Sequence, residues 1–202
     1  SAIARKAQVP REMMAARIFG KPFVITEFNF VKPNLYRAEG GPLIGAYSAL
    51  QDWDGLYRFA WSHSRNSVVG INPPTMFDAA NDPLVQLSDR IAVLMFRRGD
   101  VEAAREKYAI AVPDDLFDAG RMLSFSETPA PLQLGLIARI GSFAGDAPLP
   151  GGVFRLPFSA TFNPRSTHNG RIRGLWEKTV KNGIARSSTG QITLNSGAKT
   201  FA

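Results

Sequence analysis

The chain has 202 residues, 45% of them hydrophobic, which is enough apolar material for one or two domains with a packed core. Its formal net charge is +7, but Lys and Arg are scattered along the chain, and this pattern does not predict specific nucleic-acid binding. The lack of cysteine excludes disulfides, thiolate metal sites and a cysteine nucleophile, and no apolar run approaches the roughly 18 residues that span a membrane.

Helical and strand patterns alternate along the first hundred residues. Apolar residues at helical spacing, with glycine or basic residues near the carboxyl end, predict helices over 10–20, 42–53 and 82–98. The second of these is apolar on most sides and should be well buried. Clusters of β-branched and aromatic residues predict buried strands over 21–28 and 56–61. Because such alternation is typical of α/β units, we expect the two strands to be parallel.

The second half of the chain has a less regular pattern. A strand is predicted over 106–113, and 131–143 fits either a helix or a helix that continues into a strand. Gly and Pro cluster over 144–152, a helix is predicted over 170–183, and a short strand over 190–195.

Both predicted strands of the first half end in polar or amphipathic residues. The first carries Glu27 and is followed by Asn29, while the second ends at Trp61 and leads to His63. An unpaired carboxylate is costly to bury, so Glu27 should be paired, solvated or functional. In (β/α)-barrels the active site lies at the carboxyl ends of the strands. These four residues therefore form the candidate site.

The block GKPFVITEFNFVKPNLYRAEGGPLIGAYSALQDWDGLYRFAWSHS, residues 20–64, resembles the last two barrel strands of retaining glycoside hydrolases of the large (β/α)8 clan. It is most similar to the β-galactosidase-like and agarase-like bacterial enzymes. In that clan the nucleophilic glutamate lies on the seventh strand in a context like TEFN, which falls on Glu27. The eighth strand commonly ends in a Trp beneath the sugar, which falls on Trp61. Residues 77–101 resemble the helix and connection after the barrel, and 185–195 the start of a later β-rich segment.

The resemblance implies an α/β fold, the C-terminal part of a (β/α)8 TIM barrel followed by a smaller α/β or β-rich segment. The last βα units would occupy 1–105, and 106–202 would begin an accessory domain. A whole barrel needs about 250 residues, so we expect this chain to be part of a larger enzyme. The expected partners are a carbohydrate substrate and the remainder of the barrel or an associating chain, with no membrane. The sequence does not fix the compartment, and the resemblance implies a secreted or periplasmic bacterial protein.

The implied reaction is hydrolysis of a poly- or oligosaccharide by double displacement, which uses two carboxylates about 5–5.5 Å apart. We expect Glu27 to be the nucleophile and Asn29, Trp61 and His63 to bind the sugar, with no metal or cofactor. In this clan the acid/base residue ends the fourth strand, for which the 26 residues before Glu27 leave no room. We therefore expect this chain alone to be inactive.

A non-catalytic interpretation is open for the chain as a whole, and a purely structural role is open for each candidate residue. The whole could be a non-catalytic carbohydrate-binding or assembly module in which Glu27 has no partner acid. Individually, Glu27 could form an ion pair with Lys21 or Arg58, Asn29 a turn, Trp61 part of the core, and His63 a solvated loop residue.

Overall fold

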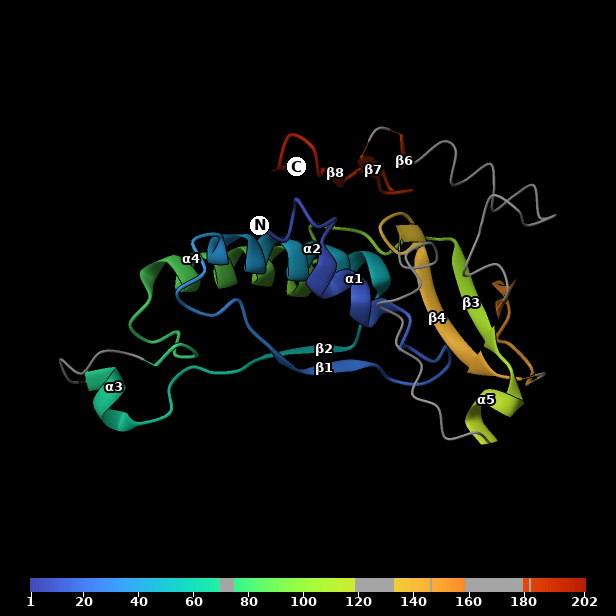
Figure 1. Ribbon diagram of the computed structural model, residues 1–202, viewed down its shortest axis with the longest axis horizontal. Coiled ribbons are helices and arrows are strands. Elements are labelled where there is room, and N and C mark those ends of the chain that lie inside the picture. The colour runs from blue at the N-terminus through green and yellow to red at the C-terminus, as the bar shows by residue number, and fades with distance from the viewer. Residues whose placement is uncertain (70–74, 119–132, 146, 159–179, 182) are drawn as a thin grey trace.

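The computed structural model describes residues 1–69, 75–118, 133–145, 147–158, 180–181 and 183–202, which form a mixed α/β structure (Figure 1). The helical elements are α1 (Gln8–Met14), the 3-10 helix η1 (Arg37–Glu39), α2 (Gly40–Gln51), α3 (Arg65–Val69), α4 (Pro83–Ala92), the π-helix η2 (Val93–Arg97) and α5 (Asp114–Asp118). The strands are β1 (Val24–Phe28), β2 (Gly55–Arg58), β3 (Lys107–Val112), β4 (Arg139–Ala144), β5 (Val153–Pro157), β6 (Val180–Lys181), β7 (Ile184–Arg186), β8 (Thr193–Asn195) and β9 (Thr200–Phe201).

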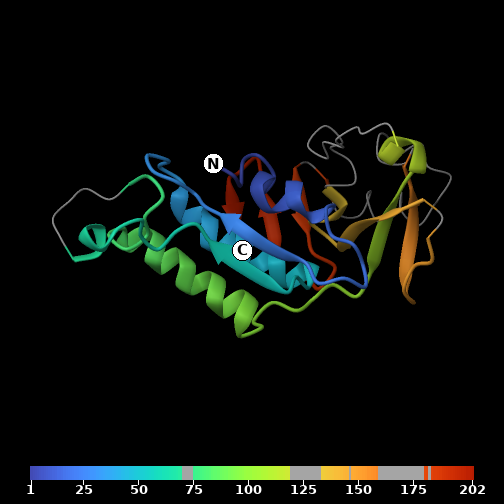
Figure 2. The same cartoon turned by 90° about the horizontal axis from the view of Figure 1, so that it is seen from below.

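Strands β1 and β2 pair in parallel, as the alternation of helices and strands predicted. Helices α2 and α4 lie along one face of this pair, as the two views in Figures 1 and 2 show. The predicted helices over 42–53 and 82–98 are confirmed as α2 and as α4 with its extension η2. Asp82 caps α4 by accepting a hydrogen bond from the Val85 N–H, and a proline at the first helical position reinforces this start.

Helix α2 is buried on almost every side, which confirms the prediction made from its apolar residues. The β1–β2 pair lies on one side of it and the antiparallel sheet β6-β7-β8-β9 on another (Figure 1). Tyr47 of α2 and Phe201 of β9 bring their ring centroids to 5.9 Å. Helix α4 approaches α2 closely because Gly41 and Gly45 have no side chain where Ser88 and Ala92 pass.

The prediction that the first two strands are buried is wrong: no residue of β2 is buried, and Tyr57 is exposed. Strand β1 is buried only in part. Its burial alternates irregularly: Ile25 and Phe28 are buried, whereas Val24, Thr26 and Glu27 are exposed. The reason is that helices cover only one face of the β1–β2 pair in the described structure, so the other face is open to solvent. Strand patterns report an apolar face, but they do not report whether anything covers the second face.

The first predicted helix, over 10–20, ends early, at Met14. The chain beyond it pairs with strand β4: the Ser142 N–H donates to the Arg17 carbonyl at 2.7 Å, and Ile18 forms a parallel bridge with Ser142. Backbone groups engaged with a strand cannot continue a helix, so tertiary pairing overrides the local helical pattern here.

The second half contains the three-stranded parallel sheet β4-β3-β5 and the small antiparallel sheet. The strand predicted over 106–113 is confirmed as β3, and the strand option within 131–143 as β4. The strand predicted over 190–195 is confirmed in its last three residues, β8. Of the helix predicted over 170–183, residues 170–179 lie outside the described residues, and Val180–Lys181 form a strand instead.

One apolar cluster includes side chains from both halves of the chain. Gln51, fully buried at the end of α2, joins this helix to the second half of the chain. Its amide nitrogen donates to the carbonyls of Gly135 and Ala138, both at 2.7 Å. Its amide oxygen accepts from the Ile140 N–H of β4 at 2.9 Å. Within the described residues the sheets are small and open, and they form no closed barrel.

Candidate functional site

Glu27 lies at an irregularity near the carboxyl end of β1. Ile25 pairs with Leu56 and Phe28 pairs with Arg58, so two residues of β1 lie opposite one residue of β2. Such a β-bulge re-aims the side chains that it contains. It places Ile25 and Phe28 on the covered face and turns Glu27 to solvent. This bulge could not be predicted from local patterns, because it depends on the pairing with β2.

The first alternative for Glu27, a strand-end ion pair, is not seen. The guanidinium of Arg58 pairs with Asp89 of α4 and lies over the ring of Phe28, 4.9 Å from its centroid. Within the residues that the structure describes, no salt bridge involves Glu27 or Lys21. The carboxylate of Glu27 is thus exposed, and it pairs with no cation among the described residues.

Asn29 holds the ends of the two strands together. Its amide nitrogen donates to the carbonyl of Phe59 and to the carbonyl of Phe77, the second at 3.0 Å. Its amide oxygen accepts from Arg58 at 2.8 Å. Both amide hydrogens are therefore used, and one lone pair of the oxygen is what Asn29 has left for a ligand.

His63 is held against Asp78, which follows it by 15 residues in the chain. The imidazole Nδ1 lies 2.6 Å from Oδ1 of Asp78, and the His63 N–H donates to the same oxygen at 3.0 Å. The Asp78 side chain is fully covered, whereas that of His63 is 39% exposed. The hydrogen bond from His63, aided by bonds from Thr75, lowers the pKa of Asp78 although burial acts to raise it.

Three aromatic rings meet beside this pair. The ring of Phe59 lies edge-on to His63 at 5.2 Å and to Phe77 at 5.7 Å, and Phe77 lies 6.0 Å from His63. Trp61, which lies between Phe59 and His63 in the chain, has 59% of its surface exposed. The alternative that Trp61 is a core residue is therefore excluded by its exposure.

The turn around residues 77–80 joins these side chains into one site. The Phe77 carbonyl accepts from Asn29 and from the Ala60 N–H, while the N–H groups of residues 79 and 80 donate to the Trp61 carbonyl at 3.1 and 2.9 Å. Asn29 and His63 thus contact consecutive residues of the same turn. Sequence reasoning missed this turn, and Phe59 with it, because its polar residues carry no motif and act through pairing with distant segments.

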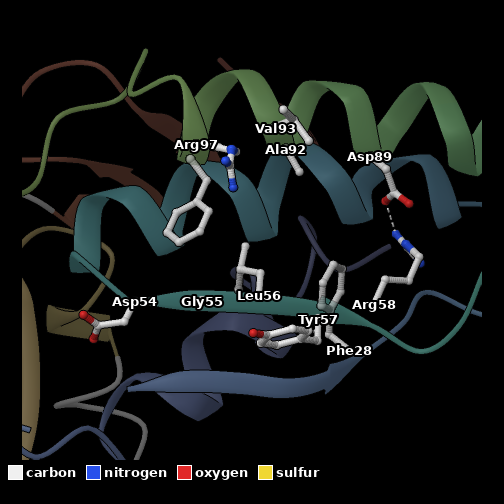
Figure 3. Close-up of a pocket in the computed structure, with 11 residues that line it drawn as sticks. Phe28, Asp54, Gly55, Leu56, Tyr57, Arg58, Asp89, Ala92, Val93 and Arg97 are labelled. Carbon is white, nitrogen blue, oxygen red and sulfur yellow. Dashed lines mark hydrogen bonds and ion pairs between the residues drawn. The ribbon is translucent and has the colours of Figure 1, made fainter. Parts of the chain in front are cut away.

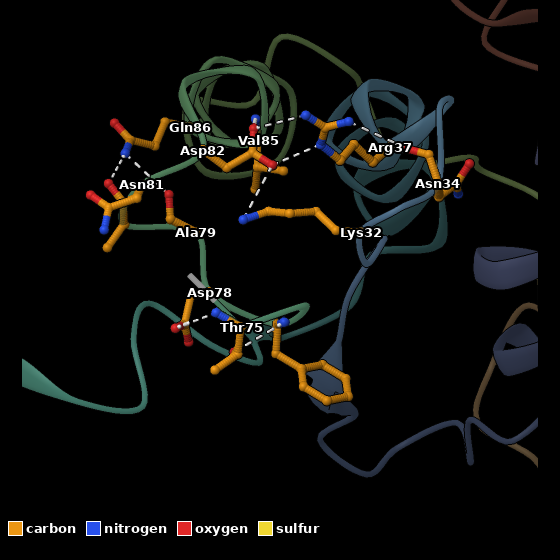
Figure 4. Close-up of polar contacts among 12 residues, drawn as sticks. Lys32, Asn34, Arg37, Thr75, Asp78, Ala79, Asn81, Asp82, Val85 and Gln86 are labelled. Carbon is orange, nitrogen blue, oxygen red and sulfur yellow. Dashed lines mark hydrogen bonds and ion pairs between the residues drawn. The ribbon is translucent and has the colours of Figure 1, made fainter. Parts of the chain in front are cut away.

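Next to this turn, at the start of α4, the buried Asp82 forms ion pairs with two basic side chains, Lys32 and Arg37 (Figure 4). Arg37 donates to both of its oxygens, at 2.7 and 3.3 Å, and the Lys32 ammonium lies at 3.8 Å. Burial alone raises the pKa of Asp82, but the hydrogen bonds from Arg37 and Val85 and the two positive charges outweigh it, so the pKa is lowered overall. This cluster anchors the loop that follows β1.

A pocket of about 410 Å³ lies between β2 and the helix formed by α4 and η2 (Figure 3). Leu56 points from β2 toward the helix, and Arg58 reaches across to Asp89. Phe28, Phe96 and Val93 complete its apolar lining. Glu27, Trp61 and His63 are not among its lining residues, so the pocket is separate from the cluster at the strand ends.

In the described part of the chain, no three His, Asp or Glu side chains are grouped so that they could hold a metal ion. None of the described helices has the length and apolar composition needed to cross a membrane. No protein-family model matches this chain, and no curated protein or solved structure matches it either. The resemblance to glycoside hydrolases therefore stays a prediction drawn from residues 20–64.

Proposed function

We propose that this chain is part of a retaining glycoside hydrolase that acts on a poly- or oligosaccharide, with Glu27 as its nucleophile. The observation that carries the proposal is the position of Glu27. It is solvent-exposed at an irregularity near the carboxyl end of one of two parallel strands, and no described Lys or Arg pairs with it. A carboxylate there is free to approach a substrate from the open face of the sheet. Bulges are over-represented next to active sites because they re-aim one side chain.

The proposed reaction is a double displacement. A carboxylate oxygen of Glu27 attacks the anomeric carbon and forms a glycosyl ester as the glycosidic C–O bond breaks. A second carboxyl group protonates the leaving oxygen and then deprotonates the water that hydrolyses the ester. Residues 1–23, all described, contain helix α1 and no strand that could carry such an acid before β1.

The sugar would lie along the exposed side chains that follow β2. Trp61 offers a ring face to the C–H groups of a pyranose, and His63 offers a polar group beside it. Asn29 contributes chiefly by holding the strand ends at the bulge, since both of its amide hydrogens are bound to carbonyls.

For the fold, we propose that β1 and β2 are the seventh and eighth strands of a (β/α)8 barrel. In the described structure they pair only with each other, and their open face exposes 42% of Val24 and 61% of Tyr57. Parallel sheets are normally covered on both faces, so a two-stranded one needs further strands and a second layer. Native and denaturing mass of the purified material test this: a co-purifying polypeptide that supplies six strands is expected, and a stable, folded, lone chain of 22.0 kDa would contradict it.

The nucleophile is tested in the assembled enzyme with a 2-deoxy-2-fluoro glycoside, which slows hydrolysis of the ester. We expect the label on Glu27, and we expect Glu27→Gln to lower turnover by several orders of magnitude while substrate binding persists. Glu102→Gln, at an exposed position in the segment after η2, is the matched control and should keep full activity. Wild-type turnover in Glu27→Gln would refute the assignment, and sugar binding without turnover in the wild type would favour the non-catalytic module.

A further inference from the structure

Asp78 is the one carboxylate that contacts a candidate sugar-binding side chain among the described residues, and its own side chain has no exposed surface. Its Oδ1 faces the Nδ1 of His63 and accepts from the His63 backbone N–H, while Oδ2 accepts from the Thr75 N–H at 3.1 Å. A carboxylate that already accepts backbone hydrogen bonds on both oxygens is stabilised in its ionised form. It can then only accept a hydrogen bond from His63.

This constraint determines which imidazole nitrogen carries the proton. In a neutral imidazole one nitrogen is a donor and the other an acceptor, and the partner of one nitrogen fixes the role of the other. Because Asp78 requires a hydrogen on Nδ1, the neutral ring has its free lone pair on Nε2. Nε2 would therefore accept a hydrogen bond from a ligand rather than donate one.

The packing around His63 restricts the ring orientation as well. Phe59 meets the ring edge-on at 5.2 Å and Phe77 at 6.0 Å with an interplanar angle of 51°. Asp78 occupies the Nδ1 side of the ring, and 39% of the His63 side chain is exposed to solvent. The exposed Trp61 lies two residues earlier on the same segment.

We infer that Asp78 is a positioning residue that fixes His63 as the Nδ1–H tautomer and presents Nε2 as an acceptor for a hydroxyl group of a polyhydroxylated ligand. That this ligand is a carbohydrate rests on the proposed function, whereas the tautomer rests on the contacts of Asp78 alone. The two parts can therefore fail separately.

The test is long-range ¹H–¹⁵N correlation NMR of the ¹⁵N-labelled full chain at about pH 8.5, where an ordinary imidazole is neutral. A His168→Gln variant assigns the His63 signals, since the chain has two histidines. We expect a pyrrole-type Nδ1 and a pyridine-type Nε2 for His63. The reverse pattern for the His63 signals would overturn the inference, whatever the Asp78 variant shows.

Two variants separate positioning from simple packing. Asp78→Ala should move both nitrogen resonances toward the Nε2–H form, whereas Asp100→Ala, which removes an exposed carboxylate paired with Arg98, should leave them unchanged. An unchanged His63 tautomer in a folded Asp78→Ala chain would overturn the role of Asp78.

Titration of the assembled enzyme, which contains the ¹⁵N-labelled chain, with lactose, a β-linked galactoside, tests the ligand class by the same NMR signals. A selective shift of the Nε2 resonance supports an accepted hydroxyl hydrogen bond. If the tautomer is as inferred but lactose and a β-linked agar oligosaccharide leave Nε2 unmoved, the role of Asp78 stands and the carbohydrate ligand of the proposed function is contradicted.

Discussion

Replacement of Gln51 by Leu should destabilise the whole chain. The fully buried amide makes three hydrogen bonds, two to carbonyls and one from the Ile140 N–H, and Leu can make none of them. With about 1 kcal/mol for each bond, and more where a buried group is left without any partner, the expected loss is roughly 3–5 kcal/mol. For a chain of this length that corresponds to a melting temperature lowered by roughly 6–20 °C.

The assay is thermal and urea unfolding followed by circular dichroism, with Gln191→Leu as the matched control. Gln191 also bridges backbone groups, accepting from the Glu102 N–H at 2.8 Å and donating to the Asp100 carbonyl at 3.1 Å, but it does so in solvent. Its loss should cost less than about 1 kcal/mol. A Gln51→Leu chain within about 1 kcal/mol of the wild type would refute the reasoning that this amide fastens the second parallel sheet to helix α2.

Three further outcomes are expected. Gly41→Ala should cost about 1–3 kcal/mol in urea unfolding, because its Cβ would lie 1.8 Å from the Ser88 carbonyl oxygen, whereas Gly151→Ala, with open space around it, should be nearly neutral. The lowered pKa of Asp82 means that its stabilising effect is complete above its ordinary value of 3.8 and is lost as pH falls through the folded value. The wild type and Arg37→Met should therefore differ in stability at about pH 6, and the difference should disappear as pH falls below the folded pKa of Asp82. Because Trp61 is exposed, Trp61→Ala should change the free energy of unfolding by less than about 0.5 kcal/mol. It should nevertheless weaken oligosaccharide binding by the assembled enzyme roughly tenfold, as measured by calorimetry.

Local patterns were enough to predict most of the elements that carry the site. Helix α2 was found from its apolar composition, α4 from its spacing, and the parallel pairing of β1 with β2 from the alternation of element types. These features depend on residues close together in the chain. The early end of α1 at Met14 was not predictable, because the residues after it pair with β4, more than a hundred residues away.

In the candidate site, too, some features follow from residues close together in the chain and others depend on contacts between distant segments. The position of Glu27 near the carboxyl end of a strand could be read from the sequence, because polar residues directly follow an apolar run. The second strand was predicted to end at Trp61 but ends at Arg58, so Trp61 and His63 lie in the segment that follows it. The role of Asp78 could not be predicted, since it is an ordinary loop acid until the turn at 77–80 pairs with residues 60 and 61, after β2, and places it against His63. Contacts between distant loops bring the side chains of the site together, and such contacts cannot be predicted from the helical or strand periodicity of the sequence.

The stretch KPFVITEFN shows why a carboxylate can end an apolar strand at little cost. With strict alternation, Ile25 and Glu27 would lie on the same face of the strand. Burying Ile25 would then bury the carboxylate of Glu27 as well. The bulge opposite β2 breaks that alternation: Ile25 and Phe28 are both buried, and Glu27 is turned to the open face. The strand therefore keeps its apolar anchors on both sides of the acid, and the desolvation cost of a buried, unpaired carboxylate is avoided. For the proposed nucleophile, this position combines a backbone held in a strand with access to solvent, as covalent catalysis by a carboxylate requires.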